Sequence, residues 1–151
     1  MKKSKSRIVN VSSLGANWVE MDLNKLKRYN DFFTDYKLSK LCNIMFTIEL
    51  ASRLRGTSVT TYSLHPGTVK TEINKDTGLR GIFIRALVRI FFKNATEGAQ
   101  TSIYCSVAND LESFSGEHFE DCRMVKRYKS ASDMMLVKKL WEESEKVVKI
   151  E

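Results

Sequence analysis

The sequence contains one proline, seven glycines and three cysteines among its 151 residues. The cysteines, Cys42, Cys105 and Cys122, are odd in number and widely separated, and no two of them form a C-x-x-C pair. Neither a disulfide framework nor a zinc knuckle fits this spacing, so a reducing compartment is predicted, without a metal site. No window holds the ~20 uninterrupted apolar residues that a membrane-spanning helix needs.

Targeting and nucleic-acid signals are also missing. The first residues, MKKSKS, are basic, but RIVNVSS then turns polar where a cleaved signal would continue as a long apolar run. The formal net charge of +7 is compatible with nucleic acid or with an anionic membrane surface. Only MKKSKSR is a dense basic cluster, however, and no nucleic-acid-binding motif is present, so no nucleic-acid partner is expected.

What is present is an ordinary globular composition, with 42% hydrophobic and 28% charged residues. A compact chain of this length can bury roughly 70% of the surface that its unfolded form exposes. We therefore expect residues 1–151 to form a single domain with its own core.

Hydrophobic patterning predicts alternating strands and helices. β-branched runs at Arg7–Val11 and Ser58–Leu64 indicate strands, and apolar residues at helical spacing predict a helix over Phe33–Leu54. Residues 16–31 are expected to be a loop with a short turn. The remaining expected elements are a short strand around His118–Phe119 and helices at Gly78–Phe92, Ala95–Ala108 and Ala131–Val148. This order favours an α/β fold in which crossover helices cover a parallel sheet.

The stretch TDYKLSK places Tyr36 and Lys40 one turn apart on the same face of the expected helix. An ammonium about 4 Å from a phenol is worth roughly 4 kcal/mol at an effective dielectric of 20, enough to bring a phenol pKa toward neutrality. General acid–base catalysis is most effective there. A fully exposed pair gains almost nothing, because solvent screens it. The sequence does not show burial, so an ordinary solvated pair remains the alternative.

Two further features lie where open parallel sheets bind ligands, at the carboxyl ends of the strands. Ser12 and Ser13 follow the first expected strand, and a serine hydroxyl there can donate to a carbonyl oxygen or position a phenol. The second strand ends in the turn HPGTVKT, where Pro66 fixes φ and Gly67 lets the backbone approach a ligand. A serine-hydrolase site using Ser13 and His65 is not favoured, because no G-x-S-x-G elbow is present.

Together, RIVNVSS, YKLSK and HPGTVKT resemble the second half of a short-chain dehydrogenase/reductase. The segments IMFTIELASRLRGTSVTTYSLHPG, ATEGAQTSIYCSVA and SGEHFEDCR are similar to its retinol dehydrogenase branch. The resemblance runs from about Ser6 to about Val148. It implies the last three strands and the helices of a Rossmann-like, doubly wound parallel sheet. It also implies hydride transfer between NADP or NAD and a lipophilic alcohol or carbonyl such as a retinoid.

The resemblance also implies a role for each matching residue. Ser13 would hydrogen-bond the substrate carbonyl, Tyr36 would be the acid–base, and Lys40 would tune the tyrosine and bind the nicotinamide ribose. The residues matching the loop that packs against the nicotinamide and its phosphates are Pro66, Gly67, Val69 and Thr71. His65 and His118 are expected to be structural.

The chain departs from the family in lacking a glycine-rich phosphate loop: no G-x-x-x-G-x-G occurs anywhere in it. The Asn-Ala-Gly turn, the fourth catalytic residue (an asparagine) and the residue that reads the ribose 2′ position have no match either. We therefore expect the N-terminal dinucleotide-binding half to be absent, with MKKSKS resembling the tail of the helix before the serine strand. Cofactor binding would be weak without the main pyrophosphate site, and the serine strand would have an open edge.

Two alternatives follow from this departure. The chain is either a shortened or fragmentary oxidoreductase, or a non-catalytic relative acting as a binding or dimerisation module. The Phe33–Leu54 helix resembles one that builds the family's dimer interface, so a homodimer or pairing with a full-length relative is expected. Residues 78–94 resemble the flap over the substrate pocket, which can also touch a membrane surface. The family location is the cytoplasm or the cytosolic face of an intracellular membrane.

Overall fold

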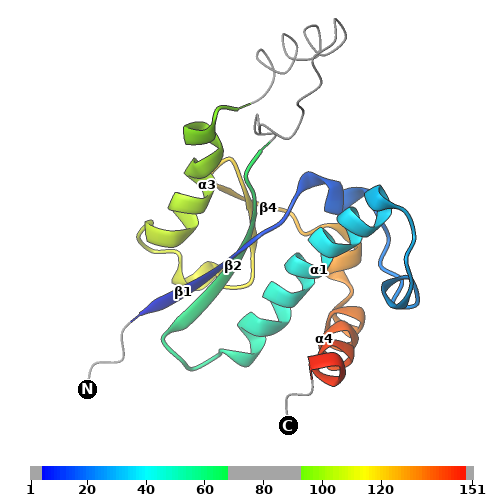
Figure 1. The fold of residues 1–151 in the computed structure, drawn as a ribbon. Helices are drawn as coiled ribbons and strands as arrows, with labels where there is room; N and C mark the ends of the chain where they lie inside the picture. Colours follow the sequence, from blue (N-terminus) through cyan, green and yellow to red (C-terminus); the bar gives the residue numbers. More distant parts are fainter. Residues whose placement is uncertain (1–4, 68–92, 149–151) are drawn as a thin grey trace, which may run out of the picture.

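The computed structural model describes residues 5–67 and 93–148, which form one α/β unit (Figure 1). Four strands lie in the order β1-β2-β3-β4, with β1, β2 and β3 parallel and β4 antiparallel to β3. The strands are β1 (Ser6–Val11), β2 (Val59–His65), β3 (His118–Glu120) and β4 (Arg123–Val125). The helices are α1 (Phe32–Arg53), α3 (Ala95–Val107) and α4 (Met134–Val148). The predicted α/β fold with a Rossmann-like parallel arrangement is confirmed, although β4 was not predicted.

Several predictions differ in detail from the structure. A loop with a short turn was expected over residues 16–31, but the structure has two short 3-10 helices in this region, η1 (Leu14–Trp18) and η2 (Lys25–Lys27). The last helix begins at Met134 and not at Ala131, because Lys129–Ser132 forms another 3-10 turn. The Asp133 carboxylate then accepts from the Leu136 amide at 3.0 Å and so caps the helix.

Some predicted features lie outside the described residues. They are the helix at Gly78–Phe92, most of the flap at residues 78–94, and the cofactor-loop residues Val69 and Thr71. In the part of the chain that the structure describes, no helix combines the length and apolar character needed to cross a membrane.

Helix α1 begins where Asp31 caps it, accepting hydrogen bonds from the amides of Phe33 and Thr34 at 3.1 Å each. Its apolar face, at helical spacing, is buried against the sheet and α4. The buried members of this core are Leu38, Leu41, Ile44, Met45 and Ile48 from α1, and Val137 and Leu140 from α4. Figure 1 shows α1 and α4 on one side of the sheet and α3 on the other.

A second core lies between the sheet and α3. Helix α3 starts with a capping box, in which Asn94 and Glu97 each accept from the other's backbone amide. Its Cys105 packs with Leu111 and with the sheet residues Tyr62, Leu64 and Phe119. Alternation along β2 therefore sends Tyr62 and Leu64 to the α3 side, while the buried Thr61 and Ser63 face the other side.

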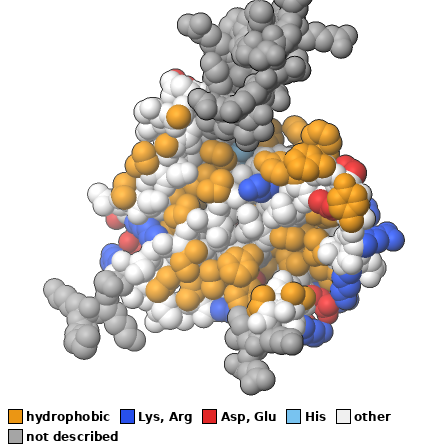
Figure 2. All heavy atoms as spheres, viewed as in Figure 1, with side chains coloured by type: hydrophobic (Ala, Val, Ile, Leu, Met, Phe, Trp, Pro, Cys, Tyr) orange, Lys and Arg blue, Asp and Glu red, His pale blue; other side chains and the backbone are white. Residues whose placement is uncertain are grey.

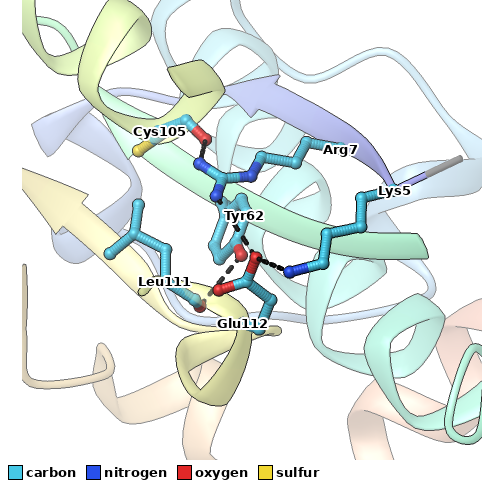
Figure 3. A network of polar contacts seen from close by, with 6 residues as sticks. All are labelled: Lys5, Arg7, Tyr62, Cys105, Leu111 and Glu112. Atoms are coloured by element: carbon cyan, nitrogen blue, oxygen red, sulfur yellow. Dashed lines mark hydrogen bonds and ion pairs between the residues drawn. The ribbon is translucent and has the colours of Figure 1, made fainter. Parts of the chain in front are cut away.

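A polar network ties the amino end of the sheet to α3 and to the turn that follows it (Figure 3). The guanidinium of Arg7 donates to the Cys105 carbonyl at 3.3 Å and lies 3.7 Å from the Glu112 carboxylate. Lys5 also donates to Glu112, and the buried Tyr62 hydroxyl donates to the Leu111 carbonyl at 2.9 Å. These contacts hold the edge strand β1 against α3.

Strand β1 lies at one end of the sheet order, so among the described residues its outer edge faces no strand. Two apolar side chains along it are exposed, Ile8 at 38% and Val11 at 45%. Such an edge is a template for pairing with another strand.

Candidate active site

The carboxyl ends of β1, β2 and β3 meet at one edge of the sheet, because the three strands are parallel. The Ser12 amide donates to the Leu64 carbonyl at 2.6 Å, which joins the ends of β1 and β2. The first half of α1 reaches the same edge. Its Asn43 side chain donates to the Val11 carbonyl at 3.0 Å, and Lys40 Nζ lies 3.5 Å from the same oxygen. This is the edge at which open α/β sheets bind ligands.

The two serines after β1 have different roles. Ser12 is 3% exposed and donates through Oγ to the Lys40 carbonyl at 2.6 Å, so it ties the strand end to α1. Ser13 is half-buried, and its Oγ accepts from the Gly15 amide at 3.2 Å as the cap of η1. The hydroxyl available to a ligand is therefore that of Ser13, the serine predicted from the sequence.

Ser13 and Tyr36 approach each other around Gly15. A methyl group placed on Gly15 would lie 3.6 Å from Ser13 Oγ and 3.8 Å from Tyr36 Cε1. Lys40 lies on the next turn of α1, with its Nζ 5.7 Å from the centre of the Tyr36 ring. The structure thus brings the three predicted catalytic side chains to one place. A methyl group at Gly15 would thus be in ordinary van der Waals contact with both Ser13 and Tyr36.

Burial of the pair, which the sequence left open, is limited in this structure. Tyr36 is 43% exposed, and Lys40 is half-buried with its ammonium nearest the Val11 carbonyl. Charge effects between groups this exposed are strongly screened by water. A covering group would have to exclude water before Lys40 acted strongly on the phenol.

The turn after β2 begins at the same edge with Pro66 and Gly67, both half-buried. Gly67 has φ +85°, a conformation that residues with side chains rarely adopt. A Cβ at this position would lie 2.7 Å from Cδ of Lys93. Lys93 in turn pairs with Asp121 at the β3–β4 turn and lowers the pKa of that carboxyl through their hydrogen bond. The turn is thus held close to a cation.

A buried polar cluster lies at the paired ends of β2 and β3, next to this turn. His118 is 1% exposed, and its Nδ1 lies 2.9 Å from the Ser63 hydroxyl. Burial is the main cause that lowers the pKa of His118 to about 4, with His65 adding to it. The Glu120 carboxylate lies 3.7 Å from His118 Nε2 and would favour a charged ring. The effect of burial on the pKa of His118 is larger than the effect of this carboxylate. His118 is therefore neutral near pH 7.

Two more groups complete the cluster. The Tyr128 hydroxyl donates to Glu120, and burial raises the pKa of Tyr128. Burial also lowers the pKa of His65, whose Nδ1 is enclosed without a hydrogen-bond partner in the described part of the chain. Sequence reasoning missed this cluster because its members come from β2, β3 and the segment before α4, with no local motif.

No family model matches the chain. Mouse retinol dehydrogenase 11 is 41% identical over 141 residues, covering 92% of this chain and 44% of the relative. Human retinol dehydrogenase 12 is 42% identical over 139 residues, covering 90% and 43%, respectively. Mouse retinol dehydrogenase 14 is 43% identical over 152 residues, covering 96% and 45%.

Over at least nine tenths of its length, the chain is similar to retinol dehydrogenases, the branch of the short-chain dehydrogenases/reductases that its motifs resemble. It spans less than half the length of the curated relatives that it matches. A crystal structure of an uncharacterized protein from Mycobacterium paratuberculosis matches with a TM-score of 0.65 and 24% identity. That match covers 95% of this chain and 50% of the other, and it supports the fold alone. The family predicted from the motifs is confirmed.

Proposed function

We propose that this retinol dehydrogenase-like chain carries the catalytic residues of an NAD(P)-dependent oxidoreductase acting on CH–OH groups. The substrate would be a lipophilic alcohol or carbonyl such as a retinoid. One observation carries the proposal: Ser13, Tyr36 and Lys40 lie together at the carboxyl end of β1. The names of the relatives, all retinol dehydrogenases, support the substrate class.

Each side chain has a role that its position allows. Tyr36 would give a proton to the carbonyl oxygen in reduction and remove it in oxidation. Ser13 would donate a hydrogen bond to the same oxygen, since its hydroxyl and the Tyr36 ring both lie next to Gly15. Lys40 would stabilise the phenolate once water is excluded, because its ammonium lies on the adjacent turn of α1.

The residues at this edge fit the nicotinamide end of the cofactor. Lys40 can bind the ribose, Pro66 and Gly67 offer a close backbone approach, and the enclosed His65 Nδ1 is a polar atom without a partner in the described residues. The bound cofactor would supply or accept the hydride. The sequence has no glycine-rich loop for the pyrophosphate, so we expect weak binding of NADPH or NADH to this chain.

A chimera tests the catalytic assignment. Residues 5–148 would replace the matching segment of mouse retinol dehydrogenase 14, and oxidation of NADPH or NADH by retinal would be followed at 340 nm. We expect turnover, with Tyr36→Phe reducing kcat at least about 100-fold, because general acid–base catalysis contributes that much or more. Tyr104→Phe is the matched control, since Tyr104 lies on α3 and packs in the second core, outside the site. Full turnover by the Tyr36→Phe chimera would remove this residue from its role.

A non-catalytic binding or dimerisation module is the second candidate. It is favoured by the exposure of Tyr36 and by the open edge of β1. Titration calorimetry of the chain with NADPH, together with its mass in solution measured by light scattering, separates the two. A chain that binds no cofactor at millimolar concentration but pairs with itself or with a full-length relative fits the module. Saturable cofactor binding that Lys40→Met weakens fits the enzyme.

A further inference from the structure

We propose that the surface formed by η2 and the start of α1, residues Lys25–Phe33, docks on an anionic lipid bilayer. This docking does not require catalysis, so it can fail or succeed independently of the proposed oxidoreductase. All residues of this surface lie in the part of the chain that the structure describes.

Large apolar side chains on this surface are exposed to solvent. Tyr29 is 81% exposed, Phe32 70% and Phe33 69%, and Leu26 is 39% exposed. The rings of Phe32 and Phe33 meet edge to face with centres 5.5 Å apart. On the upper right of Figure 2, around the start of α1, hydrophobic side chains lie beside Lys and Arg side chains. Clustered exposed aromatic rings of this kind mark interaction surfaces, and such rings favour the interface between water and lipid.

Basic side chains border the same aromatic residues. Lys25, Lys27 and Arg28 line a hollow of about 430 Å³ whose opposite wall is α1. Lys27 pairs with Glu143 at 3.0 Å, while Lys25 and Arg28 have no acidic partner within 4 Å among the described residues. Free cations beside exposed aromatic rings complement anionic phosphate headgroups, which attract Lys and Arg near the membrane surface.

The acidic groups near this surface are already engaged. Asp31 accepts from two α1 amides as the helix cap. Both oxygens of Asp35, which also line the hollow, accept from Asn30, at 3.3 Å from its amide and 2.7 Å from its side chain. Asn30 Nδ2 also donates to the Lys25 and Arg28 carbonyls. These bonds clamp the segment onto α1, so the cations and rings are presented in a fixed shape.

The Lys25–Phe33 surface lies next to the candidate active site along α1. At about 100° per residue on a helix, Tyr36 lies between Phe32 and Phe33 when viewed down the axis of α1. A lipophilic molecule leaving the bilayer past these two rings would reach the Tyr36 hydroxyl within one helical turn. Docking here would therefore present the candidate active site to molecules dissolved in the membrane.

Vesicle sedimentation with the whole chain tests the docking. We expect binding to vesicles of phosphatidylcholine with phosphatidylserine, little binding to phosphatidylcholine alone, and weakening as salt increases. Lys25→Ala with Arg28→Ala should reduce the partition coefficient about tenfold, as should Phe32→Ser with Phe33→Ser. The matched control on α4 is Lys138→Ala, Lys139→Ala and Met135→Ser, all exposed, which should leave binding unchanged. Circular dichroism confirms that each variant is folded.

Three results would overturn the docking. The first is binding that the α4 control reduces as much as the Lys25–Phe33 variants, which would indicate a general effect of net charge. The second is no binding to the anionic vesicles by the folded parent chain. The third is self-association that the Phe32→Ser and Phe33→Ser variant abolishes while vesicle binding persists, which would assign the surface to a second copy of the chain.

Discussion

The Ser12 hydroxyl donates to the carbonyl of Lys40 at 2.6 Å, joining the end of an edge strand to the helix that carries the candidate acid–base. Because Ser12 is buried, this bond holds the backbone from which Ser13 projects. The position of Ser13 relative to Tyr36 thus depends on the neighbouring Ser12.

We expect Ser12→Ala to lower the free energy of unfolding by about 1–2 kcal/mol, because it removes a buried hydrogen bond. Urea denaturation followed by circular dichroism measures this. Ser39→Ala is the control, since the exposed Ser39 also donates to a helix carbonyl, that of Tyr36 at 2.7 Å. Its cost should be below about 0.5 kcal/mol. Equal costs for the two variants would contradict the structural role of Ser12.

Protonation of His118 is expected to destabilise the fold. Its pKa is about 4 when folded, against 6.5 for an ordinary histidine, so the unfolded chain takes up the proton first as the pH falls. The neutral ring contributes fully to the free energy of unfolding above pH 6.5. This contribution is lost between pH 6.5 and 4, by up to about 1.4 kcal/mol per pH unit.

The two histidines of the chain allow a direct measurement. In a His65→Gln variant, His118 is the sole histidine, and its ring signals in nuclear magnetic resonance should not titrate between pH 7.5 and 5.5. A midpoint near pH 6.5 in the folded protein would show that the ring is not enclosed as described.

The contact between α1 and α4 depends on Trp141. Its ring stacks on Phe46 with centres 4.9 Å apart, and the Arg53 guanidinium lies 4.5 Å from its centre. Trp141→Leu should cost about 2 kcal/mol of stability through the lost stacking and cation–π contacts. Trp18→Leu, at a side chain that is 67% exposed, should change stability by less than about 0.5 kcal/mol. Similar thermal midpoints for both variants would mean that α4 is not held by this ring.

The three cysteines should differ in reactivity. Burial raises the pKa of Cys42 to about 11 and that of Cys105 to about 12, so neither is a thiolate at pH 8. Cys122 is half-exposed in the β3–β4 turn and should be alkylated first by iodoacetamide. Mass spectrometry of tryptic peptides follows each site, and Cys122→Ser should remove the fast phase. Modification of Cys42 at the same rate would argue against the raised pKa of its thiol.

Much of the fold could be predicted from the sequence, because β1, β2 and α1 have strong local patterns. The hairpin to β4 could not, because its turn uses Asp121 and Cys122 at positive φ, 48° and 58°. Tight hairpin turns are usually signalled by Asn-Gly or Asp-Gly, and no glycine stands here. The strands are also only three residues long, too short for alternation to be visible.

The candidate site was also predictable in part, because some of its features are local in the sequence. The spacing of Tyr36 and Lys40 and the place of Ser13 after a strand are local features, and these three side chains lie near one another in the structure. Exposure depends on what packs over the site from elsewhere, so the 43% exposure of Tyr36 had no sequence signal. The cluster around His118 is likewise assembled from distant segments.

The register of the sheet also bears on how fast this chain can fold. Ser6 pairs with Val59 and Ser63 pairs with His118, so both parallel contacts join residues more than 50 positions apart. Each pairing must close a long loop before any ladder bond offsets the lost chain entropy. We therefore expect helix α1 to gain structure within microseconds, and the sheet to lag behind it by orders of magnitude in time.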